Sequence, residues 1–363
     1  MGKRIVVCCD GTWNTPDKTK SIVESGNKKI KVPCPTNVVK FALAVRSESD
    51  SDGKKQLTYY DPGIGTSGWF LERWFDGATG YGISKNIIQA YKFLISNFEI
   101  GDELFLFGFS RGAFTVRSLA GLIRNSGILK TNEASLIKRA YKLYKSRAPS
   151  THPNEKEARL FRKTFAVADI VPIKFIGVWD TVGSLGNPLF INTVFSKISL
   201  SIISNQFHDT DLSSTVSYAY QALAIDEKRR QFKPTLWQKR EQSEKANYKT
   251  EELDQVWFKG VHSNIGGGIE LTGLSDIALK WMLGKAKKCN LDFDEIETNE
   301  NASENIKESW KGFYKLMLPF YRKIGVKPNG FESVDITADN QFFENNNYKP
   351  RNLKTYFDRS VNK

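Results

Sequence analysis

Residues 103–113 read ELFLFGFSRGA, and the rest of the chain is expected to be organised around this stretch. A short apolar run ends at Gly108, Ser110 follows, and after Gly112 apolar residues continue at helical spacing. This is the pattern G-x-S-x-G, in which a sharp turn between a strand and a helix exposes a serine hydroxyl. The turn strains the serine backbone, so glycines are needed on both sides because a β-carbon would collide there. An ordinary strand-to-helix turn is the alternative explanation.

Strands and helices are expected to alternate on both sides of this turn. Apolar runs predict strands over 4–9, 56–60, 103–109, 173–180 and 252–258. Apolar residues at helical spacing predict helices over 38–45, 84–98, 115–123, 218–225, 274–286 and 308–324, with a basic helical region over 131–165. Such alternation is typical of an α/β fold with a mostly parallel central sheet and helices on both faces. Residues 15–37 and those after 324 are expected to lack regular structure.

The composition describes a globular chain with a basic surface. Its 363 residues are 40% hydrophobic, enough for one large α/β domain. The four cysteines show no CxxC spacing, so reduced, buried thiols are expected instead of disulfides or a zinc site. The formal net charge of +13 favours anionic partners such as phospholipid head groups, and a solvated basic surface explains it equally well. No helix-turn-helix, RNA-binding or zinc-finger motif is present, so we expect no nucleic-acid partner.

Neither a signal peptide nor a transmembrane helix is expected. Residues 1–4 lead directly into an apolar segment that polar residues soon follow, and no apolar run approaches the length of a membrane span. A cytoplasmic location is therefore predicted. Export would require a secretion system that reads no signal peptide.

Two further residues follow predicted strands and complete a candidate site. Asp180 ends the strand over 173–180, and His262 lies just past the strand over 252–258 in a glycine-rich turn. The carboxyl ends of parallel strands share one edge of a sheet, so both side chains are expected near Ser110. The order Ser, Asp, His is that of α/β-hydrolases. The alternatives are that Asp180 only caps a loop and that His262 is structural.

These residue types suit acyl transfer. His262 would take the proton of Ser110 as the hydroxyl attacks a carbonyl and would pass it to the leaving group, while Asp180 fixes the imidazole tautomer. The oxyanion would bind the backbone N–H of Arg111 and an N–H from the turn at Gly11 and Thr12.

Two loops resemble parts of other enzyme sites, but neither motif is complete. Asp10-Gly11-Thr12 is similar to the D-x-D-G-T of haloacid-dehalogenase phosphatases, yet Cys8 stands where their nucleophilic aspartate is required. Asp10 also has a simpler explanation as a turn cap. The glycine-rich loop over 61–82 lacks the Gly-Lys-Ser/Thr of a P-loop.

Five blocks of the sequence together resemble a known family. They are DGTWN at 10–14, YDPGIGT at 60–66, GFSRGA at 108–113, VWDTVG at 178–183 and GVHSNIGGG at 260–268. In this order they look like the uncharacterised α/β-hydrolase domain family that includes the Tle-type phospholipase effectors of type VI secretion. The resemblance covers about residues 4–285 and implies a Ser-Asp-His esterase with phospholipase A activity. One departure is Asn264, where the family pattern has aspartate.

The sequence thus predicts a serine esterase or lipase that hydrolyses acyl esters, phospholipids first among them, without cofactor or metal. Its partners would be that substrate and an anionic membrane in peripheral contact, and the oligomeric state stays open. The alternative is a catalytically silent hydrolase-fold module that binds anionic membranes or a partner protein.

The domain prediction divides the chain near residue 290. The catalytic domain is expected over 1–290, with an apolar insertion at 187–215 that forms either a lid or membrane-facing flap, or a buried core helix. Residues 291–363 are expected to form a polar linker, a helix and an irregular tail that pack on the same domain.

Overall fold

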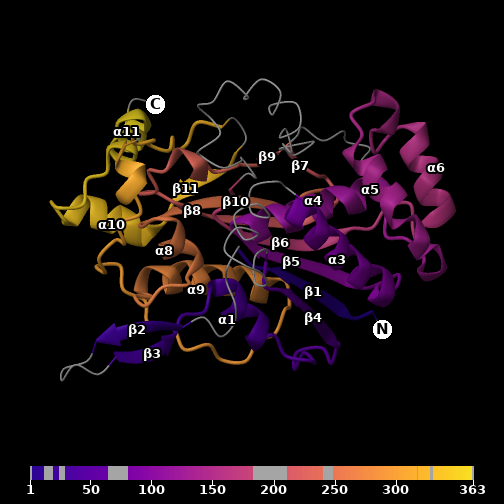
Figure 1. Cartoon of the computed structure of the whole chain (residues 1–363), viewed down its shortest axis with the longest axis horizontal. Coiled ribbons are helices and arrows are strands. Elements are labelled where there is room, and N and C mark those ends of the chain that lie inside the picture. The colour runs from indigo at the N-terminus through magenta and orange to yellow at the C-terminus, as the bar shows by residue number, and fades with distance from the viewer. Residues whose placement is uncertain are drawn as a thin grey trace.

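A parallel sheet runs through the centre of the molecule (Figure 1). The computed structural model describes residues 2–11, 19–23, 29–63, 81–182, 211–239, 248–316, 318–327 and 330–361. Seven strands form this sheet in the order β11-β10-β8-β6-β5-β1-β4, and all neighbours pair in parallel. They are β1 (Arg4–Cys9), β4 (Gln56–Asp61), β5 (Glu103–Phe109), β6 (Ile173–Trp179), β8 (Val216–Ala224), β10 (Glu252–Phe258) and β11 (Glu332–Val334). The predicted α/β fold with a mostly parallel sheet is confirmed.

The strands are apolar because helices cover both faces of the sheet. In β5, Leu104 and Leu106 belong to one buried cluster, while Phe105 and Phe107 belong to another. This division follows from the alternation of side chains along a strand. Each cluster is one of the two layers of core between the sheet and its helices.

The helices divide between the two faces in the same way. On the face of Leu104 lie α3 (Tyr81–Asn97), α4 (Arg111–Ser126), α5 (Ile137–Lys145) and α6 (Lys156–Phe165). On the face of Phe105 lie α1 (Asn37–Ala44) and α9 (Gly273–Lys288), which the short helix α8 (His262–Gly266) precedes. The chain ends in α10 (Ile336–Glu344) and α11 (Arg351–Val361), beside β11 and at the opposite end of the molecule from α6 (Figure 1).

The helix predicted over 218–225 is wrong, because residues 218–224 belong to strand β8. All residues from Ala219 to Ala224 are buried. A strand covered on both faces shows no alternation, so its apolar pattern cannot be told from that of a buried helix. The position of β8 between β6 and β10 accounts for this complete burial.

Three expectations for segments without strong patterns also differ from the structure. The region 15–37 contains an antiparallel hairpin of β2 (Thr19–Val23) and β3 (Lys29–Pro33). The helix expected over 308–324 is reduced to a 3₁₀ turn at Gly312–Leu316, since Pro319 cannot continue a helix. The tail expected to be irregular contains β11, α10 and α11.

The cysteines and the lengths of the helices are also subjects of sequence predictions. The four cysteines are free and buried, as predicted. Within the described ranges, no helix combines the length and the apolar character needed to cross a bilayer. Residues 187–210 of the insertion predicted at 187–215 lie outside the described residues. Residues 64–80 of the glycine-rich loop over 61–82 also lie outside them.

Candidate active site

Ser110 lies in the sharp turn between β5 and α4. Its backbone angles are φ 57° and ψ −118°, a region that residues with a β-carbon seldom adopt. The turn is crowded on both sides. A β-carbon on Gly108 would lie 2.6 Å from the backbone of Gly112, and one on Gly112 would lie 2.0 Å from the carbonyl oxygen of Cys9. Only glycine fits at these two positions, and α4 can therefore begin directly against the end of β1.

The structure brings Ser110, Asp180 and His262 into one chain of hydrogen bonds. His262 Nε2 lies 2.9 Å from Ser110 Oγ, and His262 Nδ1 lies 2.6 Å from Asp180 Oδ2. Ser110 follows β5, Asp180 follows β6 and His262 begins α8 after β10, so all three lie at the carboxyl edge of the sheet. In the tautomer that this geometry favours, Nδ1–H donates to the carboxylate and Nε2 accepts from the serine hydroxyl.

Aromatic rings enclose the imidazole of His262. The centre of the Phe109 ring lies 4.6 Å from the centre of the imidazole, and the centre of the Phe232 ring lies 4.9 Å from it, with that ring edge-on. Ser110 is 8% exposed and His262 7% exposed, whereas Asp180 is completely buried. Ser110 and His262 keep a small exposed fraction, and Asp180 keeps none.

Asp180 is ionised despite its burial. Burial alone would raise the pKa of its carboxyl group, but the charge of Arg322 and the hydrogen bond from His262 outweigh burial and hold that pKa below its ordinary value. Arg322 Nη1 lies 2.6 Å from Asp180 Oδ1, and Arg322 Nη2 lies 2.9 Å from Asp180 Oδ2. The N–H of Ala224 also donates to Asp180 Oδ1, at 3.1 Å. The carboxylate is thus fixed from three directions.

Sequence reasoning missed Arg322. The residue lies in a segment without regular structure, 142 positions after Asp180 in the chain, and no motif surrounds it. A single arginine in a chain with 53 lysines and arginines carries no signal of its own.

Of the three expected oxyanion donors, Arg111 and Gly11 belong to the described residues. The N–H of Arg111 belongs to the first turn of that helix, whose N–H groups point out of the helix start. The N–H of Gly11 donates to Asp10 Oδ1 at 2.6 Å, so in this conformation it is directed at its neighbour. Thr12 lies outside the described residues.

Asp10 anchors the loop that follows β1. Its Oδ2 accepts from Thr36 Oγ1 at 2.5 Å and from the hydroxyl of Tyr60 at 3.0 Å. These bonds tie the end of β1 to α1 and β4. The turn-cap explanation given for Asp10 from the sequence agrees with its bond to the N–H of Gly11.

Residues 3–285 match the family model described as "T6SS, Phospholipase effector Tle1-like, catalytic domain". The chain belongs to this family. The match ends before Arg322, so this arginine lies beyond the Tle1-like catalytic domain as the family model defines it.

The Tle1-like chain is also similar to one curated protein and to two solved structures. "Uncharacterized protein YEL023C" of Saccharomyces cerevisiae is 30% identical over 251 residues, which are 64% of this chain and 32% of that protein. The chain spans about a third (32%) of the length of this curated relative. The "Crystal structure of an uncharacterized protein from Pseudomonas aeruginosa" has a TM-score of 0.42 and 15% identity, and the match covers 83% of this chain and 47% of that one.

The second solved structure is the "Structure of the Tle1 effector bound to the VgrG spike from the Type 6 secretion system". It has a TM-score of 0.39 and 18% identity, and the match covers 73% of this chain and 51% of that one.

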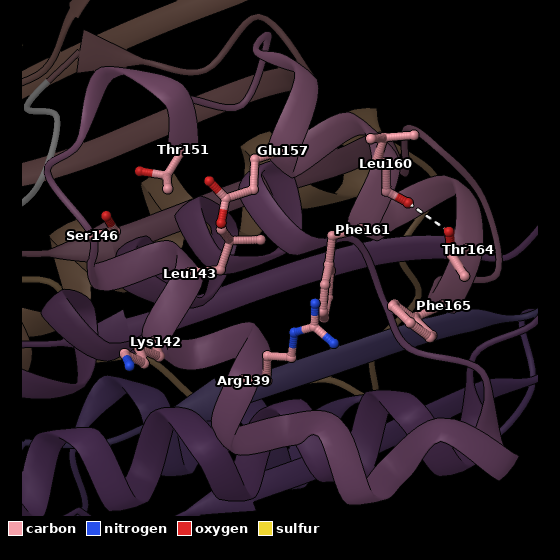
Figure 2. A pocket seen from close by; sticks show the side chains of 10 residues that line it. All are labelled: Arg139, Lys142, Leu143, Ser146, Thr151, Glu157, Leu160, Phe161, Thr164 and Phe165. Carbon is pink, nitrogen blue, oxygen red and sulfur yellow. Dashed lines mark hydrogen bonds between the residues drawn. The ribbon is translucent and has the colours of Figure 1, made fainter.

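A hollow of about 520 Å³ lies between α5 and α6 of the Tle1-like chain (Figure 2). Its lining includes the apolar side chains of Leu143 and Phe161 and the basic side chains of Arg139 and Lys142. The guanidinium of Arg139 lies 5.5 Å from the centre of the Phe161 ring. This hollow is lined entirely by residues of 139–165, and the candidate site lies elsewhere, at the ends of β5, β6 and β10.

Metal-ligating side chains are not clustered in the part of the chain that the structure describes. No group of three or more His, Cys, Asp or Glu side chains lies there in positions that could hold a metal ion.

Proposed function

We propose that this chain is a serine esterase of the lipase type, which hydrolyses acyl esters of phospholipids through an acyl-enzyme on Ser110. One observation carries the proposal: the continuous chain of hydrogen bonds from Ser110 through His262 to Asp180. The family described as Tle1-like phospholipase effectors supports the lipid substrate.

The first half of the reaction forms the acyl-enzyme. His262 Nε2 accepts the proton of Ser110 as Oγ attacks the ester carbonyl carbon. The resulting oxyanion lies at the start of α4, where the N–H of Arg111 and the positive end of the helix dipole stabilise negative charge. The tetrahedral intermediate then collapses, the imidazolium passes its proton to the alcohol oxygen, and a lysophospholipid leaves.

The second half releases the fatty acid. Water takes the place of the alcohol, His262 accepts a proton from it, and the hydroxide oxygen attacks the acyl carbon. The second tetrahedral intermediate collapses as Ser110 recovers its proton from the imidazolium. Asp180 stabilises the imidazolium in both halves, because its low pKa keeps it ionised.

Peripheral contact with an anionic membrane belongs to the same proposal, because the substrate is a membrane lipid. The net charge of +13 supports this contact. Helix α5 has the sequence IKRAYKLYK, with four basic residues and no acidic one, and Lys138, Lys142 and Lys145 are exposed. A basic surface of this kind is attracted to anionic head groups.

Residues 1–290 are proposed as the catalytic domain, with 291–363 packed on it. The buried side chains of Leu291 and Phe293 support the packing of the linker, and Ala338, Phe342 and Leu353 support that of the tail. Export without a signal peptide fits the family's description as secretion effectors.

The test is the release of fatty acid from phospholipid vesicles, with products identified by mass spectrometry. The wild-type protein should yield one fatty acid and one lysophospholipid per lipid cleaved, and Ser110→Ala should yield neither. Ser118→Ala is the matched control, because Ser118 is a buried serine of the same helix outside the hydrogen-bond chain, and it should retain activity. Products formed equally by Ser110→Ala would exclude the proposed mechanism.

A further inference from the structure

Arg322 reaches the candidate site from a segment outside the family match. The segment 318–327 passes along the carboxyl edge of the sheet, where the N–H of Phe320 donates to the carbonyl oxygen of Lys228 at 2.8 Å. Arg322 is 1% exposed. Besides its two bonds to Asp180, it donates to the carbonyl oxygens of Ala224 and Phe232, at 2.9 Å and 2.5 Å. Four hydrogen bonds therefore fix the plane of the guanidinium.

The planar fork of Arg322 meets both oxygens of Asp180 at once. This bidentate geometry defines the orientation of a carboxylate more strictly than a single point charge would. His262 Nδ1 approaches Asp180 Oδ2, one of the two oxygens that Arg322 holds. A rotation of the Asp180 carboxylate would break its bonds to Arg322 and to His262 together.

The charges around His262 form a compact set of four groups. Asp180 and Glu227 are the carboxylates, and Arg322 and Arg229 are the guanidiniums. Glu227 Oε2 accepts from the backbone N–H of His262 at 3.3 Å and pairs with Arg229 at 2.8 Å. The pKa of the Glu227 carboxyl is lowered, because Arg229 and Arg322 together outweigh its burial.

One more carboxyl group lies close to the loop that precedes His262. Asp226 Oδ2 accepts from the N–H of Gly260 at 2.8 Å and from the hydroxyl of Tyr348 at 3.0 Å. The charges of Lys228 and Lys259 act on Asp226 and favour its ionised form. Because the charge of Arg322 also acts on Glu227, a variant that keeps this charge is needed to separate the orientation of Asp180 from the change of charge.

We propose that Arg322 is a positioning residue, which holds the Asp180 carboxylate toward His262 Nδ1 and offsets part of the negative charge that His262 faces. The inference rests on the proposed function, since it assigns a role within the same site. It makes the segment 318–327 a part of the active site, although the family match ends at residue 285.

A purely structural role is the alternative, and Arg4 provides the comparison. Arg4 is also 1% exposed, and it donates to Asp52 at 3.0 Å and to Glu103 at 3.2 Å. It lies at the amino end of β1, at the opposite edge of the sheet from Asp180. Arg4→Met therefore removes an equally buried arginine without touching the site.

The experiment measures, as a function of pH, the rate at which a fluorophosphonate labels Ser110. Arg322→Met should lower the rate at the optimum by about 100-fold, because the carboxylate is no longer fixed. In the pH–rate profile of Arg322→Met, the fall of the labelling rate at low pH (the acid limb) should move to higher pH by about one unit, because the unpaired charge of Asp180 favours the imidazolium. Arg322→Lys keeps the positive charge but loses the bidentate geometry, so its labelling rate at the optimum should fall while its acid limb remains at the pH of the wild type.

Arg4→Met should lower thermal stability and leave both the labelling rate and the pH of the acid limb unchanged.

An NMR titration of the His262 imidazole supplies a readout that needs no activity. In Arg322→Met the imidazole should take up its proton at a higher pH than in the wild type and in Arg4→Met. Equal titrations in these three proteins would overturn the inference, as would a wild-type rate in Arg322→Lys. If Arg322→Met does not fold, the rate and acid limb of Arg322→Lys decide. A wild type that titrates as expected but takes no label would overturn the proposed function alone.

Discussion

Ser110 and Asp180 both have positive φ angles, 57° and 41°. Each is the first residue after a central strand, and each turns its side chain toward His262 across the carboxyl edge of the sheet. Such angles are costly for residues with a β-carbon and persist only where the surroundings enforce them. For Asp180 the enforcing groups are Arg322 and the N–H of Ala224. Both are residues that the proposed reaction needs to hold still.

Asp226 should make stability depend on pH. Burial raises the pKa of its carboxyl from 3.8 to about 6. The folded state then binds this proton more tightly than the unfolded state, so the stabilisation is complete below pH 3.8 and is lost as pH rises through about 6. Asp226→Asn should remove this contribution to the pH dependence of the free energy of unfolding. At pH 7 the variant should unfold at a higher urea concentration than the wild type. Urea unfolding at pH 5 and pH 7 measures it, and parallel changes in both proteins would contradict the assignment.

At the scale of elements, the turn from β5 into α4 leaves no room for a β-carbon at Gly108 or Gly112. Gly112→Ala should destabilise the protein by about 3 kcal/mol or more, because the new methyl would overlap the backbone of Cys9. The rate at which a fluorophosphonate labels Ser110 should also fall in this variant. Gly284→Ala in α9 is the control: no atom lies within 4 Å of its added β-carbon, and alanine favours helix by about 1 kcal/mol. Thermal unfolding of both variants tests this, and equal stabilities would contradict it.

The same scale shows what the sequence could predict. Ser110, Asp180 and His262 each follow a strand, and parallel strands end at one edge of the sheet, so their proximity can be predicted from the sequence. Their catalytic roles stay a prediction. Strand β8 was mistaken for a helix because burial on both faces removes the periodicity that distinguishes the two. Arg322 could not be found, because its contact with Asp180 depends on tertiary packing of an irregular segment far along the chain.

For the whole molecule, the basic surface should govern contact with membranes. Binding to anionic vesicles should weaken as salt rises and the Debye length falls from about 30 Å at 0.01 M to about 8 Å at 0.15 M. Neutral vesicles should bind less at every salt concentration.

A pair of charge reversals tests whether α5 contributes. Lys138→Glu with Lys142→Glu should weaken binding more than Lys354→Glu with Arg359→Glu in α11, although both pairs change the net charge equally and all four side chains are exposed. Co-sedimentation with vesicles measures the difference. Equal losses would mean that net charge alone, and not the face of α5, determines the contact.

The nucleophile can be identified directly by fluorophosphonate labelling followed by peptide mass spectrometry. We expect one adduct, on Ser110, which is absent from Ser110→Ala and forms much more slowly in His262→Ala because the proton acceptor is missing. Folded wild-type protein that takes up no label, or takes it up on another residue, would contradict the role of Ser110 as nucleophile and favour a catalytically silent module that binds membranes or a partner protein.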